Sequence, residues 1–212
     1  MIRLHGYWRS GTSYRTRIAL NLKGVDYEQV PVNLLAGSQR DEAYRALNPQ
    51  SLVPALEGDG AVLTQSPAIL EWLEERHPDP PLLPAAPNDR ATVRAMAALI
   101  GCDIHPLNNL RVLNVIRGDF GADGEAVKRW TARWIADGFA ALEQLVERHG
   151  GQFAFRDTPT LVECYLVPQV YSAERFGVDC APYPRLMAVA ERARALPEVA
   201  AAHPDRQPDA AG

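Results

Sequence analysis

The first eighty residues alternate between short apolar segments with a two-residue period and longer segments with helical periodicity. Gly24 follows the first helical segment as a stop signal, and Gly58-Asp59-Gly60 separates two strand-like runs as a hairpin turn would. Ser66 and Pro67 have the residue types of an N-cap and a first helical position. The pattern predicts strands at 2–7, 26–32, 52–57 and 61–64, and helices at 13–23, 39–47 and 65–74. A small mixed sheet with helices follows from this order.

The pattern changes at residues 78–87, a proline-rich stretch that predicts a stiff connector. Beyond it helical periodicity dominates to about residue 203, and Thr160 with Glu163 has the form of a capping box. We therefore predict an α/β N-terminal domain over 1–80 and an all-α C-terminal domain over 88–212. The last twelve residues, 201–212, are expected to be extended or loosely packed.

Composition narrows the functional classes. The 212 residues carry a formal net charge of −4 and no basic run, so nucleic acid is not an expected partner. No window approaches the ~18 consecutive apolar residues of a membrane helix, and no membrane association is expected. Cys102, Cys164 and Cys180 are too few and too scattered for a disulfide framework, which favours a cytoplasmic protein.

The segment Arg9-Ser10-Gly11-Thr12-Ser13 lies where the first predicted strand gives way to a helix. Unpaired backbone N–H groups and the positive end of the helix dipole favour an anion there. The segment offers hydroxyls but no Cys, His or carboxylate that could act as a nucleophile. It therefore suits a protein that stabilises an anion brought by a cofactor, for instance a thiolate. The alternative is ordinary N-capping by Thr12 or Ser13.

Two other local features each allow a structural and a functional interpretation. Pro54 removes a ladder donor near the start of a predicted strand. It marks either an edge strand or a cis Val53–Pro54 bond that presents backbone groups to a peptide-like ligand. Gln65-Ser66 opens a predicted helix, where Ser66 either caps the helix or helps to bind a ligand carboxylate.

The segment around Pro106 places polar side chains within a predicted long helix, which this proline is expected to kink. Helical spacing would put Asn108 and Arg111 on one face. His105 and Asn109 would share a neighbouring face.

A metal site is not expected. Cys102 and His105 would supply half of a zinc site, and no second pair of ligands is present in the sequence. A nucleophilic cysteine activated by His105 is equally weakly supported, since no third orienting group is indicated.

Taken together, these features resemble the glutathione transferase family, with a thioredoxin-like N-terminal domain and an all-helical remainder. The resemblance covers nearly the whole chain and is closest to the zeta class. That class shows a Ser-Ser-Cys-x-Trp-Arg-x-Arg-Ile-Ala-Leu motif, which corresponds to the segment 10–20 here. Further matching segments are Ala46–Pro49, Leu52–Pro54, Gln65-Ser66, Val167–Val170, Ala173–Phe176 and Arg206–Asp209.

The chain departs from the zeta-class motif at Gly11 and Thr12, which stand in place of the second Ser and the Cys. This Ser-Gly-Thr-Ser form, with the later segment 100–106, resembles the bacterial maleylpyruvate isomerase branch of the class. The maleylacetoacetate branch usually keeps the Cys. Its loss argues against a catalytic role for it, whereas Ser10 remains available to stabilise a thiolate.

The resemblance implies a glutathione-dependent cis–trans isomerase that converts a maleyl β-diketo acid, maleylpyruvate or maleylacetoacetate, to its fumaryl isomer. Ser10, with Thr12 in reserve, would stabilise the thiolate, and cations would hold the dicarboxylate substrate. The implied cationic residues are Arg9, Arg111 and Arg175. The implied glutathione-binding positions are Ser10, Gly11, Val53, Pro54, Gln65, Ser66, Asn108 and Asn109. A homodimer and a place in gentisate or homogentisate breakdown are also implied.

Two rival functions remain at this stage. A general conjugating or dehalogenating glutathione transferase would use the same thiolate, but it would not need cations for a dicarboxylate. A non-catalytic glutathione-binding module would need neither, although Ser10, Val53-Pro54 and Gln65-Ser66 argue against it.

Overall fold

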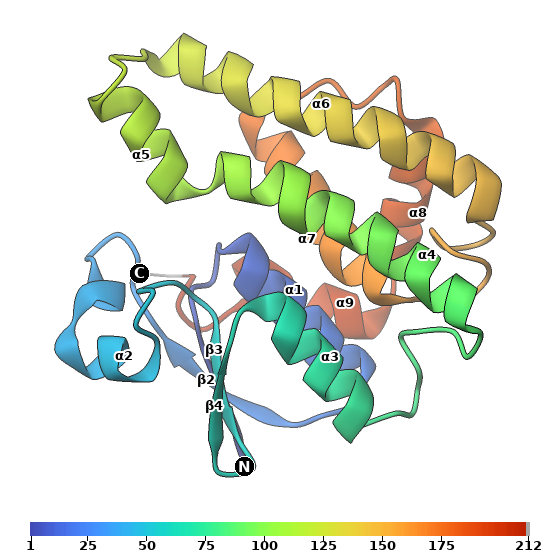
Figure 1. The fold of residues 1–212 in the computed structure, drawn as a ribbon, viewed down its shortest axis with the longest axis horizontal. Coiled ribbons are helices and arrows are strands. Elements are labelled where there is room, and N and C mark those ends of the chain that lie inside the picture. Colours follow the sequence, from blue (N-terminus) through green and yellow to red (C-terminus); the bar gives the residue numbers. More distant parts are fainter. Residues whose placement is uncertain (211–212) are drawn as a thin grey trace. The chain divides into compact units, whose positions relative to one another are not determined.

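The structure, a computed structural model, describes residues 1–210 (Figure 1). It divides into two compact units. The first contains Met1–Leu82 together with the C-terminal segment from Ala195, and the second contains Leu83–Arg194. The sequence assigned all residues from 88 onward to one helical domain, but by compactness the C-terminal segment groups with the first unit.

The first unit is built on a four-stranded mixed sheet with the order β2-β1-β3-β4. Its strands are β1 (Ile2–Gly6), β2 (Tyr27–Pro31), β3 (Ala55–Gly58) and β4 (Ala61–Thr64). Strand β1 runs parallel to β2 and antiparallel to β3, with Leu4 paired to both Gln29 and Leu56. A parallel pair needs a crossover connection, which helix α1 (Gly11–Leu22) supplies.

Helices cover both faces of this sheet (Figure 1). Helices α1 and α3 (Ser66–Arg76) lie side by side over one face, and the short α2 (Glu42–Leu47), preceded by a 3₁₀ turn at Ser38–Arg40, lies over the other. Beneath α2, Tyr44 packs with Val32 and Ala55. These elements confirm the predicted thioredoxin-like order, with boundaries shifted by a few residues.

The second unit contains only helices among its named elements. These are α4 (Pro87–Ala98), α5 (Leu110–Gly118), α6 (Gly124–His149), α7 (Leu161–Phe176) and α8 (Pro184–Arg194), with short π and 3₁₀ segments at Leu99–Ile104 and His105–Asn108. The capping box that opens α7 is confirmed, because Thr160 accepts from the helix backbone and Glu163 accepts from the Thr160 N–H at 2.7 Å. No helix of the described part is long and apolar enough to cross a membrane.

The predicted long helix through Pro106 is wrong. Helix α4 ends at Ala98, and Asn109 has an extended backbone with ψ of 144° before α5 begins. Proline lacks the N–H that would continue the helix, so Pro106 lies in the 3₁₀ segment. Asn108 and Arg111 therefore do not share a helix face, and neither do His105 and Asn109.

The expectation of a loosely packed C-terminal segment is also wrong over the described residues. The segment forms α9 (Pro197–Ala201) and a 3₁₀ turn at Pro204–Arg206. The amide of Gln207 donates to the backbone oxygens of Ala201 and His203, at 3.0 and 2.7 Å. The buried Arg17 of α1 donates to the backbone oxygen of Ala202 at 3.0 Å, which ties the segment to the first unit.

Candidate functional site

Hydroxyl groups gather at the start of α1. The oxygen of Ser10 lies 3.0 Å from that of Thr12, and Thr12 donates to the backbone oxygen of Val53 at 2.9 Å. The Ser13 N–H donates to the Ser10 oxygen at 3.3 Å, so Ser10 itself caps α1. The alternative of capping by Thr12 or Ser13 is therefore wrong, because Thr12 faces Val53 and the Ser13 oxygen accepts from the Tyr7 N–H at 3.3 Å.

Two glycines allow this crowding. A side chain on Gly6 would place its first carbon 2.9 Å from the Ser13 oxygen, so β1 can approach the helix only with glycine at that position. Gly11 is the first residue of α1, directly after the cap. The backbone at the helix start is therefore closely packed and free of side-chain bulk.

The assignment of donor hydrogens shows which hydroxyl can donate a hydrogen bond to an anion. A hydroxyl carries one donor hydrogen and two acceptor lone pairs. Thr12 uses its hydrogen on Val53, so in the Ser10–Thr12 pair the hydrogen belongs to Ser10. A thiolate at the helix start would therefore compete with Thr12 for the Ser10 hydrogen, while the Ser13 N–H continues to polarise the Ser10 oxygen.

The Val53–Pro54 peptide bond is cis, so the cis geometry is confirmed, and the presentation of backbone groups to a ligand stays a prediction. Two side chains hold the residue before Val53: Tyr44 and Asn48 both donate to the backbone oxygen of Leu52, at 2.6 and 2.7 Å. Burial raises the pKa of Tyr44 to about 12, against a smaller opposing effect of Asn48, so Tyr44 stays a donor at neutral pH. Two side chains thus hold the backbone just before Val53.

A strained residue opens α3. Gln65 has φ of 67° and ψ of 109°, an unfavourable conformation for a residue with a side chain, and such strain is concentrated at functional sites. Its amide donates to Gln50 at 2.5 Å. Ser66 is not the N-cap: it is the first helical residue, and its oxygen accepts from the buried Arg15 at 2.9 Å. Since Arg15 can only donate, the Ser66 hydrogen remains available to a carboxylate.

Arg9 lies in the turn between β1 and α1. Its guanidinium is positioned 5.2 Å from the centre of the Trp8 ring, a cation–π distance. The side chain is half-buried and directly precedes Ser10. A cation and the candidate thiolate-stabilising hydroxyl are therefore adjacent in one turn.

The other candidate residues belong to the second unit. Both side-chain amide atoms of Asn108 are shielded from solvent, and no described group hydrogen-bonds them. Such an unpaired buried amide fits a ligand, because buried polar groups are normally paired. Asn109 is less available, since its side-chain oxygen caps α5 through the Arg111 N–H at 3.1 Å.

The two candidate arginines of the second unit are exposed. Arg111 lies in the first turn of α5. Arg175 lies in the last turn of α7, with its guanidinium 5.7 Å from the Tyr171 ring and 5.8 Å from the Phe176 ring. These ring contacts restrict the orientation of the Arg175 guanidinium.

Sequence reasoning missed three residues that support the site: Gln50 beneath Gln65, Arg15 beneath Ser66, and Asp209, which accepts from the Trp8 N–H at 2.9 Å. A charged residue inside the apolar stripe of a helix could have pointed to Arg15. Nothing in local spacing points to Gln50 or Asp209, because each lies far along the chain from its partner.

Known proteins resemble this chain over its full length. Residues 9–76 match the family model of the glutathione S-transferase N-terminal domain. A maleylpyruvate isomerase from Ralstonia is 53% identical over 212 residues, covering 99% of this chain and 100% of that protein. A maleylacetoacetate isomerase from Pseudomonas aeruginosa is also 53% identical, over 211 residues and 98% of each chain.

Solved structures of similar proteins agree with the sequence comparison. A holo maleylpyruvate isomerase described as a bacterial zeta-class glutathione transferase has a TM-score of 0.96 and 53% identity, covering 98% of this chain and 99% of its own. A maleylacetoacetate isomerase from Methylobacterium extorquens, solved with malonate and glutathione bound, has a TM-score of 0.94 and 40% identity, with coverage of 98% and 99%. The chain therefore belongs to the glutathione transferase family, within the zeta class that contains the maleylpyruvate and maleylacetoacetate isomerases.

Proposed function

We propose that this chain catalyses the glutathione-dependent cis–trans isomerisation of a maleyl β-diketo acid to its fumaryl isomer. The observation that carries this proposal is the hydroxyl cluster at the start of α1, joined by Thr12 to the cis Val53–Pro54 segment. It provides a donor for a sulfur anion next to a backbone edge that suits a peptide. The relatives named as isomerases of such acids support the substrate class.

The residues of the first unit bind and orient the cofactor. When bound, glutathione would supply a nucleophilic sulfur whose addition lets the double bond rotate as a single bond and whose elimination restores the double bond in the trans product and regenerates glutathione. Ser10 donates its hydrogen to that sulfur, and the N-terminus of α1 adds its positive dipole; together they hold the sulfur as the thiolate. Thr12 fixes the Ser10 hydroxyl, and Gly11 leaves the helix start open.

Glutathione binding uses the backbone and the start of α3. Val53, oriented by the cis bond to Pro54, pairs with the cysteinyl part through its backbone. Gln65 and Ser66 take the γ-glutamyl carboxylate, a group that the amides of a helix start favour. Asn108 contributes its unpaired amide, and Asn109 keeps its capping role and offers only its remaining donors.

The cations act on the substrate. A maleyl diacid carries two carboxylates, and charge builds on its keto oxygen when the sulfur adds to the double bond. We assign Arg9, Arg111 and Arg175 to these charges, since guanidinium groups match carboxylate geometry. The malonate bound in the M. extorquens relative shows that a family member accepts a dicarboxylate.

Two further features complete the proposal. We infer a homodimer, as the resemblance to the family implies. We also infer a cytoplasmic enzyme, which suits the free thiols of Cys102, Cys164 and Cys180.

The test is a coupled ultraviolet assay on the purified protein. Maleylpyruvate and maleylacetoacetate are generated by their ring-cleaving dioxygenases, and formation of the fumaryl product is followed with and without glutathione. We expect fast turnover that requires glutathione, and the ratio of kcat/KM names the preferred acid. Turnover of neither acid, with glutathione still bound and a neutral electrophile conjugated, would contradict the proposal and favour a general transferase.

Arg9→Ala separates the two functions in the active enzyme. Losing one charged hydrogen bond to a carboxylate costs about 1.5–3 kcal/mol, or roughly 10- to 100-fold in kcat/KM for the diacid. Conjugation of the neutral 1-chloro-2,4-dinitrobenzene should change little. Equal losses on both substrates would contradict the assignment of Arg9 to the substrate carboxylate.

A further inference from the structure

The turn that carries Arg9 is held from the far end of the chain. Residues Tyr7 to Ser10 form a tight turn, closed by the Ser10 N–H donating to the Tyr7 backbone oxygen at 3.0 Å. Trp8 and Arg9 occupy its two central positions. Such a turn has few internal contacts, so its orientation depends on the hydrogen bonds that other segments make to its central residues.

Both peptide groups that flank Trp8 are gripped by side chains. The Trp8 N–H donates to one carboxylate oxygen of Asp209 at 2.9 Å, and the Trp8 backbone oxygen accepts from Arg17 at 2.8 Å. Because Arg17 also donates to Ala202, one guanidinium joins the turn to the C-terminal segment. With both peptide planes fixed, the direction in which Arg9 leaves the backbone is fixed as well.

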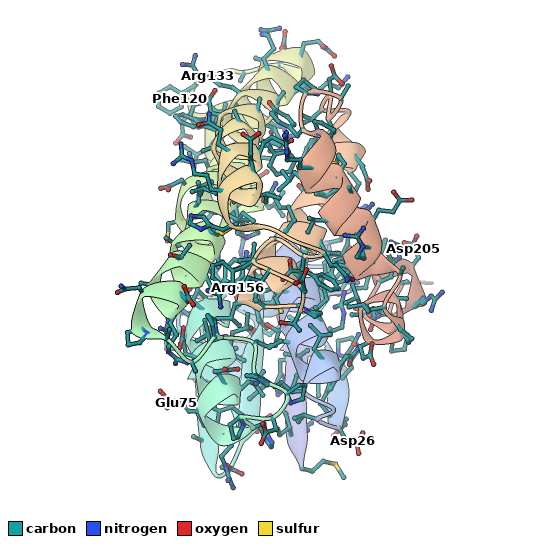
Figure 2. The ribbon with its side chains drawn as sticks, turned by 90° about the vertical axis from the view of Figure 1, so that its right-hand side faces the viewer. Asp26, Glu75, Phe120, Arg133, Arg156 and Asp205 are labelled. Carbon is teal, nitrogen blue, oxygen red and sulfur yellow. The ribbon has the colours of Figure 1, made fainter. Side chains whose placement is uncertain are left out.

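Asp209 is itself anchored to the sheet. Its second carboxylate oxygen accepts from the side-chain amide of Gln29 on β2 at 2.9 Å. Each of its oxygens therefore has one partner, on different elements, so the carboxylate bridges the sheet and the turn. Asp205, four residues earlier, is different: its side chain is 71% exposed and points outward from the segment (Figure 2).

We propose that Asp209 is a positioning residue of the active site, which aims Arg9 at a substrate carboxylate by fixing the Tyr7–Ser10 turn. This inference rests on the proposed function, because it assigns Arg9 to a dicarboxylate. It adds that the C-terminal segment, far from the helix start in sequence, sets the specificity of the enzyme for a dianionic substrate over a neutral one.

Dicarboxylate binding tests the proposal without depending on isomerisation. The probe is malonate, measured as an inhibitor of 1-chloro-2,4-dinitrobenzene conjugation by the full chain. Displacing a binding group by about 1 Å can cost up to 100-fold, so we expect Asp209→Ala to raise the inhibition constant at least about tenfold. The conjugation rate without malonate also depends on Ser10, which ends the same turn, and should fall by a clearly smaller factor than malonate binding. Every constant in the matched variant Asp205→Ala should change less than about twofold.

Coupling to Arg9 distinguishes positioning from general support of the fold. If Asp209 acts through Arg9, adding Asp209→Ala to Arg9→Ala should change the malonate constant less than about twofold, whereas independent effects would multiply. Asp209→Asn keeps an acceptor oxygen for the Trp8 N–H and should retain binding within about threefold of the parent protein.

Three results would overturn the proposal: an unchanged malonate constant in Asp209→Ala, independent losses in the double variant, or equal losses of conjugation and malonate binding with a lowered melting temperature. Failure of the proposed function has a different signature. In that case the parent protein binds malonate and conjugates the neutral electrophile but isomerises neither maleyl acid.

Discussion

Single residues at the start of α1 and α3 combine structural and chemical tasks. Ser10 caps α1 and is also the proposed donor to the sulfur, so its oxygen accepts from the helix while its hydrogen, which Thr12 accepts in this structure, is the one offered to the ligand. Ser66 accepts from Arg15 in the same way and keeps its own hydrogen. In both cases a backbone or guanidinium N–H occupies the lone pair and leaves the donor function to the ligand.

Gln65 offers a prediction at the residue scale. Its positive φ of 67° costs on the order of 1–3 kcal/mol for a residue with a side chain. We expect Gln65→Gly to be more stable than Gln65→Ala by about 1 kcal/mol, since glycine tolerates positive φ and is also the better N-cap. Both variants should bind glutathione about tenfold more weakly, because the loss of one hydrogen bond to a charged group has that size.

Urea denaturation and calorimetric titration with glutathione measure these two quantities on the same samples. An alanine variant as stable as the glycine variant would show that the strain is absent. Undiminished glutathione affinity in both variants would remove Gln65 from the binding site.

At the residue scale, the sequence predicts those site features that depend on neighbouring residues along the chain. The hydroxyls after β1, the cis Val53–Pro54 bond and the pair Gln65-Ser66 are all indicated by residue type and position. The partners Arg15, Gln50 and Asp209 are not, because their roles arise from contacts that only the folded chain creates.

At the scale of secondary-structure elements, the informative features are the helix ends and the contacts between helices. Helix α7 begins with a capping box whose carboxylate, Glu163, is fully buried and accepts from the N–H groups of Ala154 and Thr160 at 2.8 and 2.7 Å. Burial raises the pKa of Glu163 despite these hydrogen bonds. The Glu163 carboxylate therefore links the loop before α7 to the helix start, because it accepts from one N–H group in each.

Replacing this carboxylate should be costly. Glu163→Gln leaves one oxygen for two N–H donors, so one of them loses its partner, at a cost of about 1–3 kcal/mol in the free energy of unfolding. Glu191→Gln, on the exposed surface of α8, is the matched control and should change stability by less than about 0.5 kcal/mol. Equal stability of the two variants in urea denaturation would contradict the structural role of Glu163.

The contact between α1 and α3 gives a second prediction at this scale. Lys23, fully buried, donates to Glu74 at 2.5 Å and to the backbone oxygen of Pro80 at 2.8 Å. Lys23→Met leaves the Glu74 carboxylate buried without its cation, which should cost about 3–5 kcal/mol. The double variant Lys23→Met/Glu74→Leu should recover part of that loss, because it removes both charges. A double variant less stable than the single one would contradict this explanation.

Element boundaries show where sequence reasoning succeeds and where it stops. Amphipathic periodicity and the Thr160–Glu163 spacing predicted the strands and α7 closely, since they reflect local burial and capping. The prediction failed between Leu99 and Asn109. A π segment, a 3₁₀ segment and an extended residue stand there in place of the one predicted helix. Competing hydrogen-bond patterns around Pro106 differ by little energy and leave no clear periodicity.

At the scale of the whole molecule, the N-terminal region and the segment from Ala195 belong to one compact unit. Two contacts bind the segment from Ala195 to the N-terminal region. Arg17 donates to the backbone oxygen of Ala202, 185 residues away, and Asp209 accepts from the Trp8 N–H, 201 residues away. Composition alone suggested a loose C-terminal segment, because local propensity carries no information on such distant contacts. Periodicity and the proline-rich stretch predicted the mixed N-terminal region and the helical remainder, and the resemblance to a family fold added the thioredoxin-like arrangement.

This organisation predicts a pattern of amide hydrogen exchange. Amides of α9 and of residues 204–207 should exchange together with those of α1, because they belong to one cooperative unit. Peptides from α8, which precede α9 directly in sequence, should follow the helical unit instead. Mass spectrometry after deuterium labelling resolves the two sets. Joint exchange of α9 with α8, at a rate different from α1, would contradict the division of the chain.

The central claim is that Ser10 holds the sulfur of bound glutathione as a thiolate, and its most direct test is the ultraviolet absorbance of that thiolate against pH. A free thiol has a pKa of about 8.5. We expect the complex to titrate well below that value, and Ser10→Ala to raise the pKa by about 1–2 units, the equivalent of one hydrogen bond to a charged group.

Thr12→Val is the control in the same titration, because it removes the hydroxyl that competes for the Ser10 hydrogen, together with its hydrogen bond to Val53, and leaves Ser10 itself in place. The account predicts a pKa equal to or below that of the parent protein. An unchanged pKa in Ser10→Ala, or a rise in Thr12→Val as large as that expected for Ser10→Ala, would contradict it and move the donor role away from Ser10.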